Sequence, residues 1–207
     1  METIINASLK YQISIANQKC LAELARFVVT ENYKHHSTNL TKERESEIRT
    51  IYNEEKALYS DTSCIYIARS NQKMIGTIRV FKWDKKKKLP IEKLYGINPM
   101  EAISQEEHAE YWHVGRFAID SSAGISSIHL FKQLMLYAVS PIMNSANGYM
   151  IAEVDTKLLR VMNALGFHTH NLGDPIYYLF SETIPIWANQ KGIATFYQQY
   201  QKIYKSV

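Results

Sequence analysis

The chain has 207 residues, of which 46% are hydrophobic and 21% charged, and its formal net charge is +4. This composition is that of a globular protein and excludes a disordered or fibrous chain. The length suits one sizeable hydrophobic core, so we expect a single domain over residues 1–207. Two cysteines are too few for a disulfide framework. The apolar runs are too short to span a bilayer, and the N-terminus lacks the pattern of a secretory signal, so we expect a cytoplasmic protein with no transmembrane segment.

The positive charge is mild, and its one dense cluster is the run Lys85, Lys86, Lys87 and Lys88. One interpretation of this run is a solvated hairpin tip. The other is a docking patch for an acidic partner, such as an acyl carrier protein, through long-range attraction. No predicted helix concentrates Lys and Arg, which argues against nucleic-acid binding.

In the N-terminal third, apolar and polar residues alternate over residues 11–16, which predicts a half-buried strand. Asn17 can cap a following amphipathic helix, and a second helix is expected from Thr41. The segment between these helices, residues 31–40, is polar and rich in Asn and His. We expect it to be a mobile loop near the substrate entrance.

The middle of the chain predicts three strands. Residues 63–69 and 74–83 should form an antiparallel hairpin, because only a short polar turn joins them. A long connection over residues 89–108, with a short helix in it, leads to a strand over residues 111–120. Gly115 lies in the middle of that strand, and an isolated glycine in a strand suggests a bulge.

The C-terminal half predicts a mixed arrangement of helices and strands around one central sheet, which is an α/β fold. A turn of small residues at 121–127 opens a long apolar helix. The further expected elements are a strand at 148–154, a helix at 157–165 ended by Gly166, strands at 176–180 and 183–187, and a helix at 195–204.

The strand at 111–120 and the turn after it carry the most chemical information. The first amides of a helix have no internal partner and carry partial positive charge. A turn of Gly, Ser and Ala lets a phosphate approach those amides. A bulged strand leaves backbone N–H groups that can hold a pantetheine arm or polarise a thioester carbonyl. The alternative is an ordinary strand-to-helix turn whose small residues serve packing.

These residues resemble a known family. Trp112-His113-Val114-Gly115-Arg116-Phe117-Ala118-Ile119-Asp120 is similar to the Glu-x-Ser-Arg-Phe-x-Val strand of the acyl-homoserine-lactone (autoinducer) synthases and to the matching strand of the N-acyl amino acid synthases. Gly76-Thr77-Ile78-Arg79-Val80 resembles their Gly-x-x-Arg-Leu strand. Leu165-Gly166-Phe167 and Tyr177-Tyr178 resemble a late segment common to the GNAT superfamily. Ser121-x-x-Gly124-x-Ser126 matches the GNAT acyl-carrier loop only in part, since the leading Arg or Gln is missing.

The resemblance implies a GNAT-like fold, with a mixed central sheet and helices on both faces. It also implies an N-acyltransferase that moves an acyl group from an acyl carrier protein or acyl-CoA thioester to the amine of an amino acid or similar small molecule. Acyl-CoA or acyl-phosphopantetheine is then the co-substrate, and no metal is required. The expected donor-binding residues are Phe117, Ala118, Ile119, Ser121, Gly124, Ile125, Ser126 and Ser127.

Two other functions stay open from the sequence. One is an acetyl-CoA-dependent GNAT N-acetyltransferase, against which the incomplete acyl-carrier loop counts modestly. The other is a catalytically silent GNAT-like protein that binds a lipid or an acyl carrier.

The general base departs from the family pattern. Where the autoinducer synthases have a glutamate three positions before the arginine, this chain has His113. A neutral imidazole can accept an amine proton near pH 7. Glu110 is a second candidate base, although a regular strand would place it on the opposite face. The alternative for His113 is a strand histidine whose ring is satisfied by a neighbouring carbonyl.

Arg79 and Arg116 are expected on adjacent strands. A guanidinium can orient an acceptor carboxylate or bind the phosphopantetheine phosphate, because its donors form a bidentate fork. Alternatively, the two arginines bridge acidic residues across the sheet, with Asp61 as one partner. Cys64 is expected in the core, and the histidines lack the spacing of metal ligands.

Overall fold

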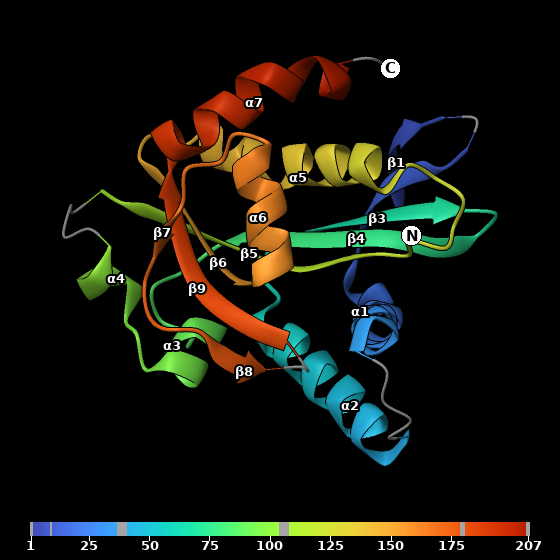
Figure 1. Cartoon of the computed structure of the whole chain (residues 1–207), viewed down its shortest axis with the longest axis horizontal. Coiled ribbons are helices and arrows are strands. Elements are labelled where there is room, and N and C mark those ends of the chain that lie inside the picture. Colours follow the sequence, from blue (N-terminus) through green and yellow to red (C-terminus); the bar gives the residue numbers. More distant parts are fainter. Residues whose placement is uncertain (1, 9, 37–40, 104–107, 179–180, 206–207) are drawn as a thin grey trace. The chain divides into compact units, whose positions relative to one another are not determined.

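The computed structural model describes all residues except 1, 9, 37–40, 104–107, 179–180 and 206–207 (Figure 1). The chain forms two compact units. Unit 1 comprises residues 1–79 and 116–135, and unit 2 comprises residues 80–115 and 136–206. Within the described residues, nine strands form one mixed sheet in the order β1-β2-β3-β4-β5-β6-β9-β7, and β8 also pairs with β9. The α/β class predicted from the sequence is therefore confirmed.

Unit 1 holds the N-terminal strands and the first helices. Its elements are β1 (Thr3–Ala7), β2 (Gln12–Ala16), the 3-10 helix η1 (Gln18–Cys20), α1 (Leu21–His36), α2 (Thr41–Leu58), β3 (Cys64–Ser70) and the first part of β4 (Lys73–Lys82). The predicted hairpin of β3 and β4 is confirmed, and its turn residues Asn71 and Gln72 have φ of 48° and 64°. Short polar residues such as Asn tolerate this left-handed region better than most, which suits a tight turn.

The predicted loop at residues 31–40 is wrong for residues 31–36, which form the last turns of α1. Val29 and Tyr33 continue the buried face of the helix at a spacing of four residues. Glu31 is buried too, and its carboxylate lies 2.7 Å from the Lys34 ammonium one turn later. This buried continuation outweighs the polar composition that suggested a loop. Residues 37–40 lie outside the described residues.

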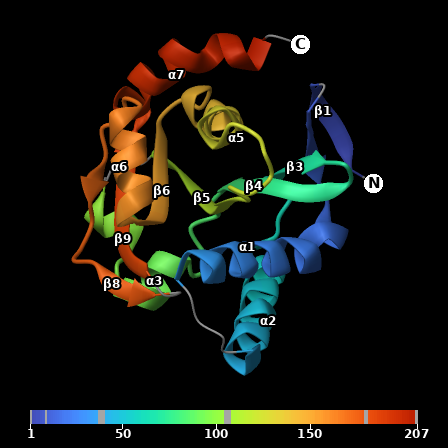
Figure 2. The ribbon, with the colours of Figure 1, turned by 45° about the vertical axis from the view of Figure 1, so that its right-hand side comes forward.

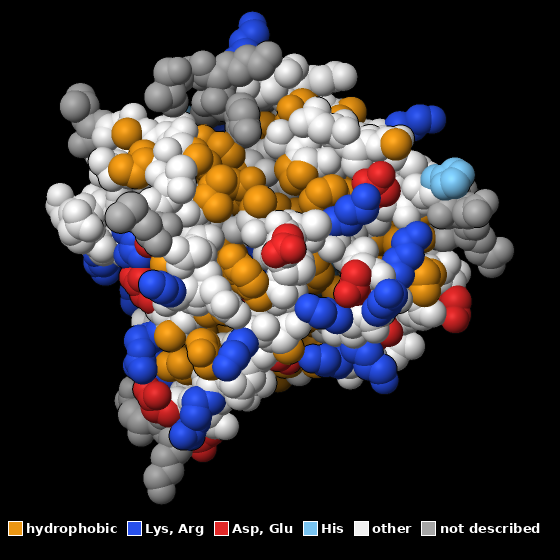
Figure 3. Space-filling model, turned by 180° about the vertical axis from the view of Figure 1, so that it is seen from behind, with side chains coloured by type: hydrophobic (Ala, Val, Ile, Leu, Met, Phe, Trp, Pro, Cys, Tyr) orange, Lys and Arg blue, Asp and Glu red, His pale blue; other side chains and the backbone are white. Residues whose placement is uncertain are grey.

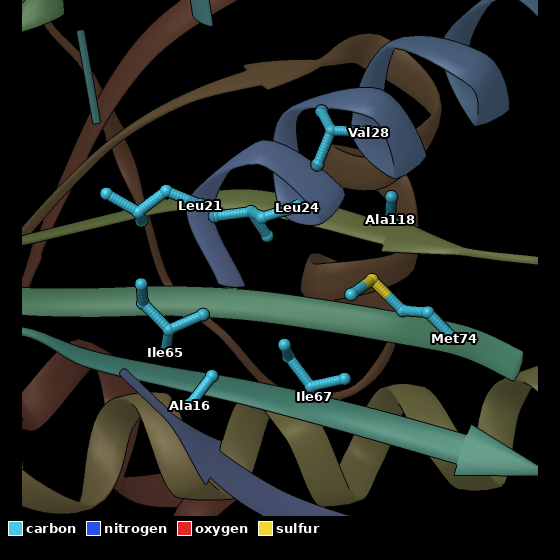
Figure 4. Close-up of a cluster of buried hydrophobic side chains, with 8 residues drawn as sticks. All are labelled: Ala16, Leu21, Leu24, Val28, Ile65, Ile67, Met74 and Ala118. Carbon is cyan, nitrogen blue, oxygen red and sulfur yellow. The ribbon is translucent and has the colours of Figure 1, made fainter. Parts of the chain in front are cut away.

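The core of unit 1 joins α1 to the sheet (Figure 4). Leu21, Leu24 and Val28 recur on one face of α1 at helical spacing and are at most 4% exposed. They pack on side chains of β2, β3, β4 and β5, which are Ala16, Ile65, Ile67, Met74 and Ala118. Burial of these side chains fixes α1 on this part of the sheet.

Unit 2 contains the rest of β4 and most of the C-terminal half, and β5 and α5 also run through both units. Its elements are α3 (Pro90–Tyr95), α4 (Pro99–Ala102), β5 (Glu110–Ile119), α5 (Ser127–Met143), β6 (Gly148–Asp155), α6 (Thr156–Ala164), β7 (His170–Asn171), β8 (Ile176–Tyr178), β9 (Ser181–Asn189) and α7 (Gln190–Lys205). Figure 2 shows α6 beside β6 and β9. Gly166 ends α6 with a φ of 96°, as predicted. No helix in the described ranges is both long and apolar enough to cross a membrane.

The start of α7 closes the end of α5. The Gln190 side-chain amide donates to the carbonyls of Ser145 at 2.7 Å, Ile142 at 3.1 Å and Met143 at 3.3 Å. The last carbonyls of a helix have no partner within it. We expect Gln190→Ala to lower the free energy of unfolding by about 1–3 kcal/mol, measured by urea denaturation. Gln198→Ala, at an exposed position of the same helix, is the control and should change it by less than about 0.5 kcal/mol. Equal effects of the two substitutions would contradict this role.

Candidate active site

Strand β5 departs from regular geometry at Arg116, whose φ of 54° lies in the left-handed region. In unit 1, the Asp120 amide donates to the Ile75 carbonyl at 2.9 Å. In unit 2, the Trp83 amide donates to the Tyr111 carbonyl at 2.8 Å. Between these two antiparallel hydrogen bonds, β5 has one residue more than β4. An extra residue on one strand is the definition of a β-bulge, so β5 is bulged as predicted.

The bulge lies one residue later than expected, because the left-handed residue is Arg116 and not Gly115. A glycine adopts positive φ without steric cost, which is why the sequence pointed to it. An arginine needs compensating contacts to stay there.

Those contacts come from two neighbouring glutamates of α2. Glu55 bridges both predicted arginines: its Oε1 lies 2.7 Å from Arg116 Nε and its Oε2 lies 2.7 Å from Arg79 Nε. Arg116 Nη2 also lies 2.8 Å from Glu54 Oε2. The side chains of Arg79 and Glu55 are only 2% and 1% exposed, so this is a buried ion cluster. The arginines thus do bridge acidic residues, but the partners are Glu54 and Glu55 and not Asp61.

His113 belongs to unit 2, where it pairs with a carboxylate that the sequence analysis did not single out. The β5–β6 register is parallel and places His113 opposite Ile151. Glu153 is two residues further along β6, so its side chain projects to the same face. His113 Nε2 lies 3.0 Å from Glu153 Oε2, and both side chains are at most 10% exposed. A carboxylate beside an imidazole orients the ring and stabilises the imidazolium that forms when the ring accepts a proton.

Two aromatic side chains, Phe81 and Tyr95, lie near this pair. The Phe81 ring centroid lies 5.4 Å from that of His113. The Tyr95 hydroxyl of α3 donates to the Thr183 carbonyl at 2.7 Å. Burial, together with the charge of Glu153, raises the pKa of Tyr95 to about 12, so its hydroxyl stays protonated.

The second candidate base, Glu110, is not brought together with His113. The β5–β6 register is regular from Glu110 to His113, so side chains three residues apart point to opposite faces. The Glu110 carboxylate instead lies 2.8 Å from the Lys82 ammonium.

The predicted donor-binding segment lies in unit 1, directly after the bulge. Phe117 packs edge-on against Phe131 of α5 with ring centroids 5.1 Å apart, and Ala118 is buried. The turn that follows is mostly exposed: Ser121, Gly124, Ser126 and Ser127 are open to solvent, and Ile125 is half-buried. Gly124 has a φ of 68°, which suits glycine. The Ser126 carbonyl accepts from the amides of His129 and Leu130, so α5 begins beside this turn.

Asp120 ties this turn to the rest of unit 1. Its Oδ1 accepts from the Ser122 amide at 3.0 Å and the Ser122 hydroxyl at 2.5 Å. Its carboxylate also lies 2.7 Å from the Lys73 ammonium and 3.4 Å from that of Lys34. Burial alone would raise the pKa of Asp120, but these hydrogen bonds and charges outweigh it and hold the pKa well below its usual range.

Because the pKa of Asp120 is lower in the folded than in the unfolded protein, its contribution to the free energy of unfolding depends on pH. The stabilisation is complete above the unfolded pKa of about 3.9 and is lost as the pH falls below it toward the folded value. We expect Asp120→Asn to lower the free energy of unfolding by about 1–3 kcal/mol at pH 7. Urea denaturation of both proteins at pH 7 and pH 3 should show this difference shrinking at the lower pH. A difference of the same size at both pH values would contradict the assignment.

The four lysines do not form a hairpin tip, because their run connects β4 to α3. The Asp84 carboxylate accepts from the amides of Lys86 and Lys87, each at 2.9 Å, and fixes the backbone of the turn. The Trp83 indole donates to the Lys87 carbonyl at 2.6 Å. All four lysine side chains, at positions 85–88, are exposed. On the face drawn in Figure 3, basic side chains are interspersed with acidic and apolar ones.

Neither cysteine forms a disulfide, and both are half-buried. In the part of the chain that the structure describes, no three His, Cys, Asp or Glu side chains cluster closely enough to hold a metal ion.

Comparisons with known proteins identify the family of the chain. The sequence profile of the N-acyl amino acid synthase FeeM family matches residues 28–186. No curated protein has a significantly matching sequence. The solved structure of FeeM, an N-acyl amino acid synthase from uncultured soil microbes, is similar with a TM-score of 0.63 at 14% identity, over 93% of this chain and 98% of that chain.

Two acyl-homoserine lactone synthases are also similar in structure. LasI has a TM-score of 0.59 at 11% identity, over 93% of this chain and 96% of its own. The CoA-dependent synthase BjaI has a TM-score of 0.55 at 14% identity, over 97% of this chain and 90% of its own. These likenesses confirm the predicted acyltransferase fold. The profile match covers the second half of α1, all elements from α2 to β8, and most of β9. The chain therefore belongs to the N-acyl amino acid synthase FeeM family and is an N-acyltransferase.

Proposed function

We propose that this enzyme transfers the acyl group of an acyl carrier protein or acyl-CoA thioester to the amine of an amino acid or a similar small molecule. The observation that carries the proposal is the family match over residues 28–186, which includes β5, its bulge and the turn into α5. A CoA thioester as donor is supported by BjaI, which is CoA-dependent and whose structure holds isopentyl-CoA.

The donor would bind along the end of β5 and the following turn. The β5–β6 register ends at His113, so the amides of Phe117, Ala118 and Ile119 lie beyond that ladder. Alternate residues of an antiparallel strand direct their amides to the partner strand, and the Asp120 amide points to β4, so the Ala118 amide faces β4 as well. The amides of Phe117 and Ile119 face the other way, and they are the donors we assign to the pantetheine arm and to the thioester carbonyl. The phosphate end would meet the exposed turn of Ser121, Gly124, Ile125, Ser126 and Ser127, where the first amides of α5 favour an anion.

In the proposed chemical step, the neutral amine attacks the thioester carbonyl. A C–N bond forms, the oxyanion of the tetrahedral intermediate is held by backbone N–H groups, and His113 takes the proton that the amine loses. The C–S bond then breaks, and the thiolate leaves and takes up a proton. The carboxylate of Glu153, 3.0 Å from the ring, would stabilise the imidazolium. We assign Glu110 no part in this step, since it faces the other side of β5.

The donor can be identified by measuring thiol release with matched acyl-carrier-protein and CoA thioesters of several chain lengths. Each thioester is offered together with a panel of amino acids. Turnover with long acyl chains supports the proposed N-acyl amino acid synthase. Turnover with acetyl-CoA alone would place the enzyme among the N-acetyltransferases. Thioester binding without turnover on any amine would favour a silent acyl-carrier-binding protein.

An acyl carrier protein as donor would dock on the lysine run at positions 85–88, which is exposed and held rigidly by Asp84. Because acyl carrier proteins are acidic, opposite charges would speed their association, and salt would weaken it. We expect replacement of all four lysines by Ser to raise KM for an acyl-carrier-protein donor about tenfold at low salt. KM for the same acyl group on CoA should not change. An equal rise for both donors would contradict docking at this run.

A further inference from the structure

We propose that Glu55 is a positioning residue that holds the strained bulge of β5, and that Arg79 and Arg116 serve this bulge and do not bind substrate. This inference rests on the proposed function, in which the amides of Phe117 and Ile119 receive the donor. It goes beyond that function because it names what keeps those amides in place.

The bulge needs an external restraint. Arg116 has a φ of 54°, a conformation in which the Cβ of any L residue comes too close to the neighbouring carbonyl oxygen. The residue after it, Phe117, carries the first of the proposed donor-binding amides. Relaxation of Arg116 to an ordinary strand conformation would remove the bulge and rotate the following peptide groups. The position of those amides therefore depends on whatever holds Arg116.

Glu55 is placed to hold both strands at this point. One carboxylate oxygen binds Arg116 of β5 and the other binds Arg79 of β4, each at 2.7 Å. Glu55 itself cannot swing away, because it lies on the buried face of α2 between Ile51 and Leu58, which are 1% and 3% exposed. The packing of α2 thus fixes the carboxylate, and the carboxylate fixes the bulge.

The charges of the cluster argue against substrate binding by the arginines. The two guanidinium groups already lie 2.7–2.8 Å from carboxylates of the protein itself, those of Glu54 and Glu55. An acceptor carboxylate or a donor phosphate would compete with a buried partner that already lies at 2.7 Å. Displacing one partner of a buried ion pair is costly.

Two substitutions at the same position separate these roles. Arg116→Ala and Arg116→Gly both remove the guanidinium, but only glycine adopts a φ of 54° without strain. If the arginine only holds the bulge, Arg116→Gly should keep kcat within about threefold of the wild type. Arg116→Ala should lose about tenfold, which corresponds to the steric penalty of the left-handed region. If the guanidinium contacts substrate, both variants should be equally inactive.

Glu55→Gln tests the carboxylate in both backgrounds. We expect it to lower kcat about tenfold in the wild type and to have no further effect in Arg116→Gly, where the bulge needs no restraint. An equal loss in both backgrounds would overturn the proposal. All rates are measured well below the unfolding temperature of every variant. If Glu55→Gln does not fold, the comparison of Arg116→Ala with Arg116→Gly decides alone.

A binding measurement keeps this test separate from the proposed reaction. Calorimetric titration with a non-reactive acyl-CoA thioether should rank the affinities of the variants as the rates rank them. Arg116→Gly should bind the thioether about as tightly as the wild type, and Arg116→Ala and Glu55→Gln should bind it more weakly. If the wild-type enzyme acylates no amine, the proposed function fails, while this order of affinities still tests Glu55. Equal affinities for all variants would overturn the role of Glu55 whatever the reaction is.

Discussion

Glu55→Gln is expected to lower the free energy of unfolding by about 3–5 kcal/mol, because it removes the shared partner of two arginines inside the protein. Arg79 is 2% exposed and cannot replace the lost contact with water. The change can be measured as the shift in the urea denaturation curve, followed by circular dichroism at pH 7.

The neighbouring glutamate provides a matched control. Glu54 forms an ion pair with the same Arg116, but its side chain is 20% exposed. Water can therefore compensate in part, and we expect Glu54→Gln to cost only about 1 kcal/mol or less. If the two substitutions cost the same small amount, the cluster is not the buried, tightly coupled network described above.

His113→Gln is expected to reduce kcat by about 10²–10⁴-fold, because it removes the group that accepts the amine proton. The glutamine amide can still donate to Glu153, so the buried carboxylate keeps a partner and the fold should survive. KM for the thioester donor should stay within about twofold, since the donor contacts are backbone amides. The measurement is thiol release under saturating acceptor.

Two further variants bracket this prediction. Glu153→Gln keeps a hydrogen-bond acceptor for the imidazole but removes the charge, so we expect a smaller loss, of about tenfold. His129→Gln, at an exposed position near the start of α5, should leave the rate unchanged. If His113→Gln turns over at the wild-type rate, His113 is a structural histidine of the strand, which was the alternative left open by the sequence.

The fold was largely readable from the sequence, because most elements carry a clear period. The strands β3, β4 and β5 were predicted within one residue of their observed bounds, and a long apolar helix was predicted to begin where α5 begins. The elements that were not predicted, or were predicted with wrong bounds, have local causes. β1 is a short edge strand whose residues are mostly exposed, so it lacks an apolar alternation. α7 begins five residues before the predicted start, where the Asn189 side chain accepts from the Gly192 amide at 3.0 Å.

Only some residues of the candidate site could be predicted from the sequence. His113, Arg79 and Arg116 follow from the resemblance of their strands to a family. The pairing of Glu153 with His113 was missed because it depends on which strand lies beside β5, and sequence spacing does not reveal that. Glu55 could have been found: it lies four residues after Ile51 and three before Leu58, so helical periodicity places it on the buried face of α2.

The bulge shows the limit of residue preferences. A glycine in a strand is a good signal for a bulge, and Gly115 indicated the correct part of β5. Its neighbour takes the left-handed conformation instead, since the ion pairs of Arg116 are tertiary contacts that no local preference encodes. Buried charge pairs of this kind are where local prediction fails.

The measurement that tests the central claim most directly is the mass of the product formed from a long-chain acyl thioester and a mixture of amino acids. We predict a new amide whose mass equals that of the acyl group joined to one amino acid, formed in equal amount to the thiol released. The amide should disappear in His113→Gln. Release of thiol with the acyl group recovered as free fatty acid, and with no amide for any amino acid, would contradict N-acyl transfer to an amine.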